Sequence, residues 1–418
     1  MLTNKYYIAI GCLVLSCTNS MAQTLSLDAI LKIIQTNNPQ LKMYDADIQS
    51  MDATAKGAKS WMPPQVSTGF FMTPYNTKMW KASEMSPGMG FYMLGVTQMI
   101  PNASKLKADF NYMNAMSSVE NENKNYTNNQ LNAIAKTNYY QWLVLNKKMK
   151  LANDNLLLLD YMIKSMEIRY QYNMDKLSTY YKAKSQYSVL ESMIVMLQND
   201  ISQKRIMINT LMARDKNTVF DIDSTYQLND FETIKSDTVS LSQNRSDVKA
   251  IEKTIEVNQL KIKAEKTKLL PEFGVQYDNM FAFGKQPQQF SLMLMVNIPF
   301  APWSSKMNKA NINSFQIKNE SLNWQKQMIL NEAMGMISGM NAELATLKKQ
   351  YDIAENKIIP ALRRNYDTSI IAWQNNTGDL FVVLDAWEAL NMAQMDALDK
   401  LQIILITQVE IEKQLETK

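Results

Sequence analysis

The spacing of apolar residues along the chain switches between two periods. Over 102–214 and again over about 304–415 the pattern is helical, and 102–214 contain neither glycine nor proline. At 65–101 and at 272–299, apolar and polar residues alternate instead. A helix repeats every 3.6 residues and a strand every two. The pattern therefore predicts a mainly α fold with long helices and two β-hairpins, or four strands.

The alternation is clearest in the second hairpin. Apolar residues there occupy every second position over long runs, namely Phe273, Val275, Tyr277 and then Phe290, Leu292, Leu294, Val296, Ile298. The first hairpin has strands at about 65–75 and 90–100 that alternate less cleanly. A proline precedes each hairpin, Pro64 and Pro271, and ends the helix before it by removing a backbone donor.

The two halves of the chain share this plan at a constant offset. Asn38 and Pro64 in the first half match Arg245 and Pro271 in the second, each pair 207 positions apart. We therefore predict an internal two-fold repeat. Its parts are a first repeat at 23–214, a polar connector at 215–244 that holds at most a short helix, and a second repeat at 245–418.

Each long helical segment is interrupted by an asparagine. Asn173 and Asn376 lie 203 positions apart, and Leu177 aligns with Leu380 at the same offset. Asparagine tolerates the left-handed backbone needed at a chain reversal better than other non-glycine residues do. The sequence thus predicts helical hairpins that turn near 173 and near 376. The alternative is that both are ordinary exposed positions in an asparagine-rich protein.

The N-terminus is typical of an export signal. Lys5 precedes the short apolar segment 6–16, and Ser20, Met21 and Ala22 form a small-residue cleavage site, which predicts a signal peptide at 1–22. Val14 to Cys17 also forms a loose lipoprotein box, which would leave a lipidated Cys17. Either interpretation predicts an exported protein.

Composition excludes several kinds of chemistry. The 418 residues include no histidine, and both cysteines, Cys12 and Cys17, lie in the predicted signal. A chain cleaved after Ala22 would contain neither cysteine nor histidine, which excludes disulfides, thiol nucleophiles, histidine bases and the common zinc sites. We expect no cofactor and no enzyme activity, and an exported hydrolase lacks any supporting motif. The net charge of +4 is spread along the chain, so nucleic acid is not an expected partner.

Two hairpins are too few strands to be stable alone. Isolated hairpins are marginal in water, and an open sheet cannot sit in a bilayer with unpaired backbone groups. A cyclic oligomer that pools strands removes both problems, and about ten tilted residues suffice to cross an outer membrane. The alternative is a soluble β layer in a secreted helical protein.

Several segments carry a family resemblance. The opening at Leu25–Ile30 with Asn38 and Pro39 resembles that of TolC-type outer-membrane efflux proteins. The segments Val96–Pro101, Val296–Pro299 and Asn376–Leu390 are similar to the family's strand-to-helix junctions and its second periplasmic turn. The resemblance covers nearly the whole mature chain.

The resemblance implies a fold, a location and partners. It implies a homotrimer in the outer membrane of a Gram-negative bacterium. Each protomer would give four strands to a transmembrane β-barrel and long helical hairpins to a periplasmic α-barrel. It also implies passive export, with a periplasmic adaptor (membrane fusion) protein as partner, an inner-membrane pump acting indirectly, and contact with outer-membrane lipid.

The resemblance also assigns site residues. The turns, as the adaptor contact, comprise Asn173, Met174, Asp175, Leu177, Asn376, Thr377, Gly378 and Leu380, and the periplasmic entrance has Asp385 and Asp379. The family usually has glycine where Asn173 and Asn376 stand, and acidic residues where Val382 and Thr179 stand. Any acidic ring at the entrance would therefore contain fewer carboxylates than is usual in the family, with Asp385 as its main member. The alternative is that Asp385 is an ordinary solvated helix residue.

Methionine is the unusual residue type. The chain has 31, and soft thioether ligands suit Cu(I) or Ag(I). The candidate ligands are Met72, Met93, Met99, Met334, Met336 and Met340, which would place the protein in the heavy-metal branch of efflux systems. The alternative is that methionine serves as a helix former and gap filler. Gly335 and Gly339 form a GxxxG pattern, for which we expect close helix packing.

The sequence favours an exit duct of a tripartite efflux system for small molecules or metal ions. Two alternatives stay open, a type I secretion duct for polypeptides and a secreted coiled-coil structural protein.

Overall fold

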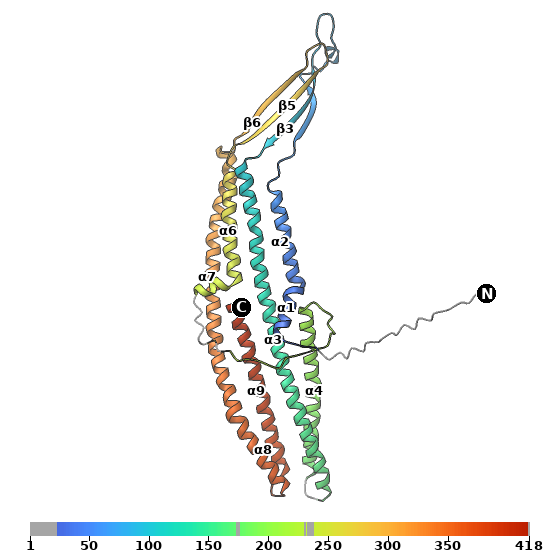
Figure 1. Cartoon of the computed structure of the whole chain (residues 1–418), viewed down its shortest axis with the longest axis vertical. Coiled ribbons are helices and arrows are strands. Elements are labelled where there is room, and N and C mark those ends of the chain that lie inside the picture. The colour runs from blue at the N-terminus through green and yellow to red at the C-terminus, as the bar shows by residue number, and fades with distance from the viewer. Residues whose placement is uncertain (1–22, 173–175, 230, 232–237, 417–418) are drawn as a thin grey trace, which may run out of the picture. The chain divides into compact units, whose positions relative to one another are not determined.

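The computed structural model describes residues 23–172, 176–229, 231 and 238–416 (Figure 1). The predicted signal peptide, with Cys17, and the turn residues Asn173, Met174 and Asp175 lie outside the described residues. The chain divides into two compact units. We call the described residues within 35–134, 228–358 and 403–416 the sheet unit, and those within 23–34, 135–227 and 359–402 the turn unit. Each unit combines segments from both predicted repeats.

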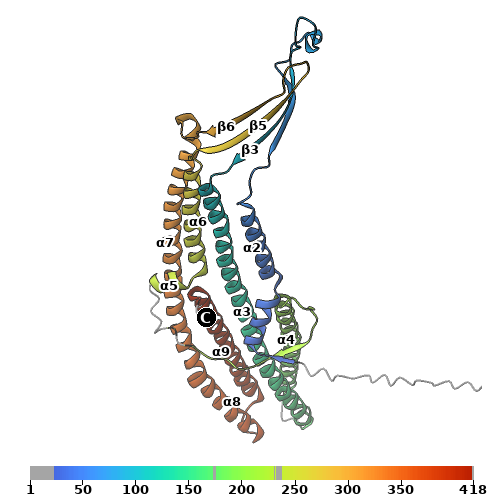
Figure 2. The same cartoon turned by 45° about the horizontal axis from the view of Figure 1, so that its top comes forward.

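The sheet unit contains the four predicted strands in one antiparallel sheet. They are β2 (Gln65–Phe71), β3 (Phe91–Ile100), β5 (Glu272–Ala282) and β6 (Gln289–Asn297). Their order is β2-β3-β5-β6, so the two hairpins join through the β3–β5 pairing, as Figure 2 shows. That central ladder runs from Phe91 opposite Ala282 to Ile100 opposite Phe273. Among the described residues, no strand pairs with the outer edge of β2 or of β6.

The two faces of this sheet differ in polarity. Because cross-strand partners lie on the same face, the register sorts the side chains without ambiguity. One face is mainly apolar and exposed, with Thr68, Gln98 and Asn279 as its polar members, and we call it the apolar face: Val66, Phe70, Tyr92, Leu94, Val96, Ile100, Phe273, Tyr277, Phe281, Phe290, Leu292, Leu294, Val296. The opposite face, which we call the polar face, carries Gln65, Ser67, Thr97, Gln276, Asp278, Gln289 and Ser291, together with several methionines and the aromatic pair Phe71 and Phe91 at one end.

Helices complete the sheet unit. They are α2 (Pro39–Gly57), α5 (Thr238–Asn244), α6 (Ser246–Thr267) and α7 (Pro302–Ile353). Helix α2 begins at Pro39, and the Asn38 side chain caps it by accepting a hydrogen bond from the Gln40 amide at 2.9 Å. A core cluster includes Leu241, Val248, Leu330, Ile337 and Leu344.

Two long helices contribute to both units. Helix α3 (Ala103–Gln171) places 103–134 in the sheet unit and 135–171 in the turn unit, and α9 (Leu380–Leu415) changes unit after Gln402. The turn unit also contains α4 (Leu177–Leu211) and α8 (Ile359–Gln374). Helix α1 (Leu27–Asn37) belongs to the same unit as far as Ile34. Strand β1 (Gln23–Leu25) pairs in parallel with β4 (Phe220–Ile222), so the predicted connector contains a strand as well as α5.

Two local features differ from a simple helix pattern. A π-helical turn, η2 (Ala354–Ile358), lies just before Pro360, where the wider turn accommodates a residue that lacks an amide donor and clashes with an α-helical carbonyl. The expected close packing at the GxxxG pattern is wrong within this chain. A Cβ on Gly335 or Gly339 would meet nothing within 4 Å, so no other described segment packs closely against these glycines.

Of the helices in the described part of the chain, none is both long enough and apolar enough to pass through a membrane.

Candidate functional site at the helical turns

The second predicted turn is built by the chain around Asn376. Asn376 has a φ of 59°, which confirms the left-handed conformation expected at the reversal. Its amide donates to the Trp373 carbonyl at 3.0 Å, and the Thr377 amide donates to the Ala372 carbonyl at 2.9 Å. These two bonds make a Schellman motif with Asn376 at the left-handed position, so α8 ends here for a local reason.

The residues after Asn376 begin the next helix. Gly378 passes close to α8, because a Cβ at that position would come 3.0 Å from the Cβ of Ala372. Asp379 then caps α9, since its Oδ1 accepts a hydrogen bond from the Phe381 amide at 2.9 Å. A short polar segment thus reverses the chain between α8 and α9.

The first turn is described only on either side of its tip. Helix α3 ends at Gln171 and α4 begins at Leu177, which is the predicted position of the reversal. Lys176 occupies the N-cap position of α4 without a side-chain capping bond. Leu177 is exposed, whereas Thr179 is buried and donates its amide to the Lys176 carbonyl. An acidic side chain at position 179 would therefore be buried.

Arg169 connects the two turns. Its Nη2 donates to Asn376 Oδ1 at 2.6 Å, and its guanidinium lies 4.9 Å from the centre of the Trp373 ring. Lys176 Nζ and Asp379 Oδ2 add an exposed ion pair at 3.6 Å, which contributes little by itself because solvent screens it. The Asn376 side chain therefore acts beyond its own turn. Sequence patterns did not single out Arg169, because its partner Asn376 lies in the other half of the chain.

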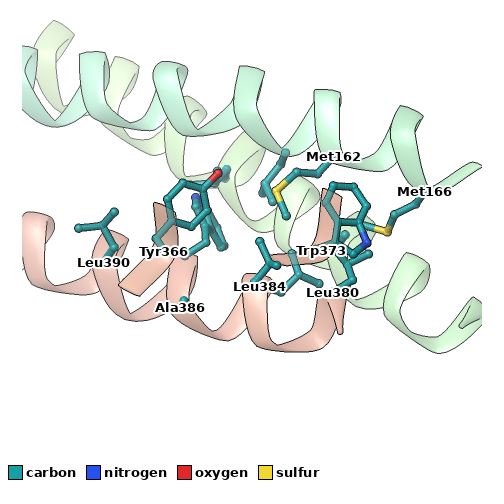
Figure 3. Close-up of a cluster of buried hydrophobic side chains, with 13 residues drawn as sticks. Met162, Met166, Tyr366, Trp373, Leu380, Leu384, Ala386 and Leu390 are labelled. Atoms are coloured by element: carbon teal, nitrogen blue, oxygen red, sulfur yellow. The ribbon is translucent and has the colours of Figure 1, made fainter. Parts of the chain in front are cut away.

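A hydrophobic core lies beneath the turns (Figure 3). It takes side chains from α3, α4, α8 and α9: Leu159, Met162, Met166, Ala183, Leu190, Tyr366, Trp373, Leu380, Val383, Leu384, Ala386, Trp387, Leu390. Leu380, assigned to the adaptor contact from the resemblance, is 1% exposed and belongs to this core. Burial raises the pKa of the Tyr366 hydroxyl to about 12, and the nearby Asp367 carboxylate acts in the same direction.

A buried amide network fixes α3 against α9. Trp387 Nε1 donates to Asn155 Oδ1 at 2.8 Å, and Asn155 Nδ2 donates to Asn391 Oδ1 at 3.0 Å. Buried polar groups cost free energy unless they are paired, so this network favours one alignment of the two helices. None of these three residues was predicted as functional, because each has its partners on another helix.

Asp385 lies on the exposed side of α9, away from that core. Phe381 and Val382, one turn earlier, are also exposed. Lys182 Nζ lies 4.1 Å from the Phe381 ring centre and 3.9 Å from Glu388 Oε2. Asp385 itself has no ion pair with a described residue. A charged residue at a channel entrance must have a carboxylate that no other side chain neutralises, and Asp385 meets this condition among the described residues. The role of Asp385 at the entrance stays a prediction.

The candidate methionines do not form one metal centre. Met334 and Met340 pack against the sheet-unit core, whereas Met336 is exposed and lines a different surface of α7. Met72 is 74% exposed with a φ of 49°. In the described part of the chain, no group of three or more histidine, cysteine or acidic side chains could hold a metal ion.

Methionines gather instead on the polar face of the sheet. Met93 lies directly opposite Met280. Met99 and Met295 reach over Gly274 from both neighbouring strands, where a Cβ would come 2.6 Å from the Met99 sulfur and 3.2 Å from Met295 Cε. Met293 lies on the same face. Met93 and Met99 of the predicted set are thus part of a larger group, whose other members only the strand register reveals.

By sequence, no protein-family model and no curated protein matches the chain. Comparison of structures is informative. The CusC structure, described as a transmembrane channel, matches with a TM-score of 0.74 at 13% identity, over 96% of both chains. The outer membrane protein VceC of Vibrio cholerae matches with a TM-score of 0.69 at 14% identity, over 93% of this chain and 96% of VceC.

The open state of the Neisseria gonorrhoeae outer membrane channel MtrE matches with a TM-score of 0.71 at 13% identity, over 93% of this chain and 88% of MtrE. These likenesses agree with the fold that the sequence resemblance implies. The chain therefore has the fold of these outer-membrane channels.

Proposed function

We propose that the protein is the outer-membrane exit duct of a tripartite efflux system and that it works as a homotrimer. The observation that carries the proposal is the sheet, which exposes a mainly apolar face and whose two edges pair with no strand in the described part of the chain. Exposing an apolar face to water costs free energy, and so does placing the unpaired backbone groups of a strand edge in lipid. Both penalties disappear if three protomers close their strands into a twelve-stranded barrel with the apolar face toward lipid.

The strand lengths and the opposite face support this arrangement. Strands β3, β5 and β6 have 10, 11 and 9 residues, which is the length needed to cross an outer membrane at a tilt. The polar face would then line the channel. Gly95 makes room there for the buried Asp278 carboxylate, because a Cβ on Gly95 would overlap Asp278 Oδ1 and Ser67 Oγ.

The helical turns supply a second part of the proposed duct. Elements occur in the same order in 39–211 and in 246–415, each with a helix, two strands and a helical hairpin, which supports an internal duplication. The turn at Asn376 and the turn near 173 would form the periplasmic entrance and contact an adaptor protein. An inner-membrane pump would supply the energy, so the duct itself needs no catalytic residues.

The proposal is tested by assembly and location. The expressed protein should remain with outer membranes after a high-salt wash, and it should have the mass of a trimer after extraction in mild detergent. A monomer in detergent, or release by salt, would contradict the duct and favour a secreted helical protein.

Soft metal ions are the second candidate cargo, and the methionines of the polar face are the observation that favours them. Thioethers at Met99, Met295 and Met293 would line the proposed channel. Replacing Met99 and Met295 together by leucine should lower the silver tolerance of cells that depend on this duct, whereas Met336→Leu should not. Equal tolerance in both would leave general small-molecule export as the function.

A further inference from the structure

The loop between β2 and β3 is fixed onto the tip of the β5–β6 hairpin. The loop contains a 3₁₀ helix, η1 (Thr77–Trp80), and lies at the end of the sheet away from α6 and α7 (Figures 1 and 2). The Phe283 and Lys285 amides donate to the carbonyls of Gly90 and Pro87, at 3.1 and 2.8 Å. A Cβ on Gly284 would overlap the Pro87 carbonyl oxygen. The β2–β3 loop and the β5–β6 turn thus pack together into one tip.

An aromatic stack forms part of this tip. The Trp80 and Phe283 rings are stacked, with centres 5.1 Å apart and planes 14° apart. Phe70 packs against both, at 5.6 and 5.8 Å between ring centres. The Trp80 indole nitrogen donates to the Pro74 carbonyl at 2.8 Å. The only polar group of the indole is therefore already hydrogen-bonded within the loop, and the remaining ring surface can make apolar contacts.

A cavity of about 430 Å³ opens beside the stack. Trp80 and Phe283 form its apolar wall, and Lys78, Lys81 and Thr77 line the rest. No acidic side chain lines it, and neither lysine has an ion pair with any residue that the structure describes. A hydrocarbon wall with two unpaired ammonium groups matches a ligand with an acyl chain and an anionic head.

The position of the cavity identifies the source of such a ligand. Phe70, Tyr92 and Phe281 lie in register across three strands at this end of the apolar face, and Phe70 belongs to both this row and the stack. Aromatic rows of this kind mark the membrane–water interface of outer-membrane proteins. The cavity is thus continuous with the surface that the proposed function places in lipid, at headgroup level.

We propose that this cavity binds an anionic lipid of the outer leaflet. The lipid phosphate lies between the Lys78 and Lys81 ammonium groups, and its acyl chain lies along the Trp80–Phe283 stack and the exposed edge of Phe70. The inference rests on the proposed membrane location, and it adds a specific lipid site on the loop to that general contact. Binding would hold the β2–β3 loop at the surface and stabilise the assembled sheet.

The test measures quenching of Trp80 fluorescence in nanodiscs. The protein is placed in phosphatidylcholine discs that contain a minor fraction of brominated phosphatidylglycerol or, in parallel, the same fraction of brominated phosphatidylcholine. The Trp80 signal is the difference between the native protein and Trp80→Phe. One ammonium near an anionic surface favours binding about fivefold. Brominated phosphatidylglycerol should therefore quench Trp80 at several-fold lower mole fraction than brominated phosphatidylcholine.

Variants identify the residues. The double variant Lys78→Gln with Lys81→Gln should lose this preference, while Lys285→Gln, on the same tip but outside the cavity, should keep it. Equal quenching by both lipids in the native protein, or a preference that survives the double variant, would overturn the lipid site. Competition by inorganic phosphate would also overturn it, because the site would then hold a free anion.

The same experiment separates this inference from the proposed function. If both brominated lipids quench Trp80 equally and the protein is trimeric, the membrane location holds and only the lipid site fails. If neither lipid quenches Trp80 in a trimer that enters the discs, the tip does not reach the bilayer and the lipid site fails alone. If the protein does not enter the discs, the membrane location fails together with the site.

Discussion

The apolar face of the sheet and the core of the turn unit contain similar side chains in opposite situations. In the turn unit, Leu380, Leu384 and Trp387 are at most 2% exposed. On the sheet, Leu292, Leu294 and Phe290 are each more than 60% exposed. The turn unit therefore completes its own core within one chain. The sheet buries no comparable core with its apolar face, and in the proposed duct lipid and neighbouring protomers would cover that face and its edges.

The largest expected effect tests the core of the turn unit. Leu384→Ala should lower the free energy of unfolding of this unit by about 2–5 kcal/mol, because it leaves a cavity among buried side chains. Leu157→Ala is the matched control in the same unit, since Leu157 is 72% exposed, and should change it by less than about 0.5 kcal/mol. Helical circular dichroism during denaturation of the detergent-solubilised protein measures both, and equal losses would remove the contrast.

The next effect tests the apolar face in lipid. Leu294→Arg places a charge on that face and should destabilise the protein in lipid vesicles by about 2–4 kcal/mol if the position lies near the bilayer midplane. Met293→Arg is the control, because the neighbouring residue points to the polar face. Urea titration of the folded trimer in vesicles measures the difference. A smaller loss for Leu294→Arg than for Met293→Arg would reverse the assignment of the two faces.

A smaller effect concerns the turn itself. Asn376→Val should cost about 1–2 kcal/mol, because a β-branched residue is strained in the left-handed region and also loses the bond from Arg169. Asn376→Gly relieves the strain while losing the same bond, so it should be close to neutral. Proteolysis at the turns under native conditions reports local opening. Identical proteolysis of the two variants would show that strain does not decide the turn.

The smallest effect on stability belongs to Asp385. Asp385→Asn should leave unfolding unchanged, because the side chain is exposed and unpaired with any described residue. In a threefold channel the same change removes three charges at one height. It should therefore reduce cation selectivity and weaken block by trivalent cations in planar bilayers. Asp160→Asn on α3, whose carboxylate is already paired with Lys164 at 2.7 Å, is the control and should leave selectivity unchanged. Unchanged selectivity for Asp385→Asn as well would place Asp385 away from the channel.

Local patterns predicted much of the fold. The alternating pattern predicted a strand at about 90–100, which matches the bounds of β3 to within one residue, and it placed β6 inside the second hairpin. The asparagine at 376 predicted a turn, and the structure confirms its left-handed backbone. These features depend on residues close together in the chain. The helix around Pro360 was less predictable, since the proline indicates a disturbance but not that a π-helical turn absorbs it.

The candidate site was predicted only in part for the same reason. The turn residues have a local signature, whereas Arg169 and Asn155 act through partners on other helices. Leu380 shows the limit most clearly. Its place beside the turn indicated a contact surface, but the packing of α9 against α3 and α8 buries it.

Neighbouring residues were enough to predict the long helices, the strands and the reversal at Asn376, because apolar period, proline position and turn chemistry are local properties. Three features came from the packing of whole elements: the pairing of β3 with β5, the approach of Met99 and Met295 over Gly274, and the place of Lys78 and Lys81 beside an aromatic cavity. Each of these joins residues distant in the chain or sets the orientation of a loop. Such contacts depend on how complete elements pack together, which no local pattern specifies.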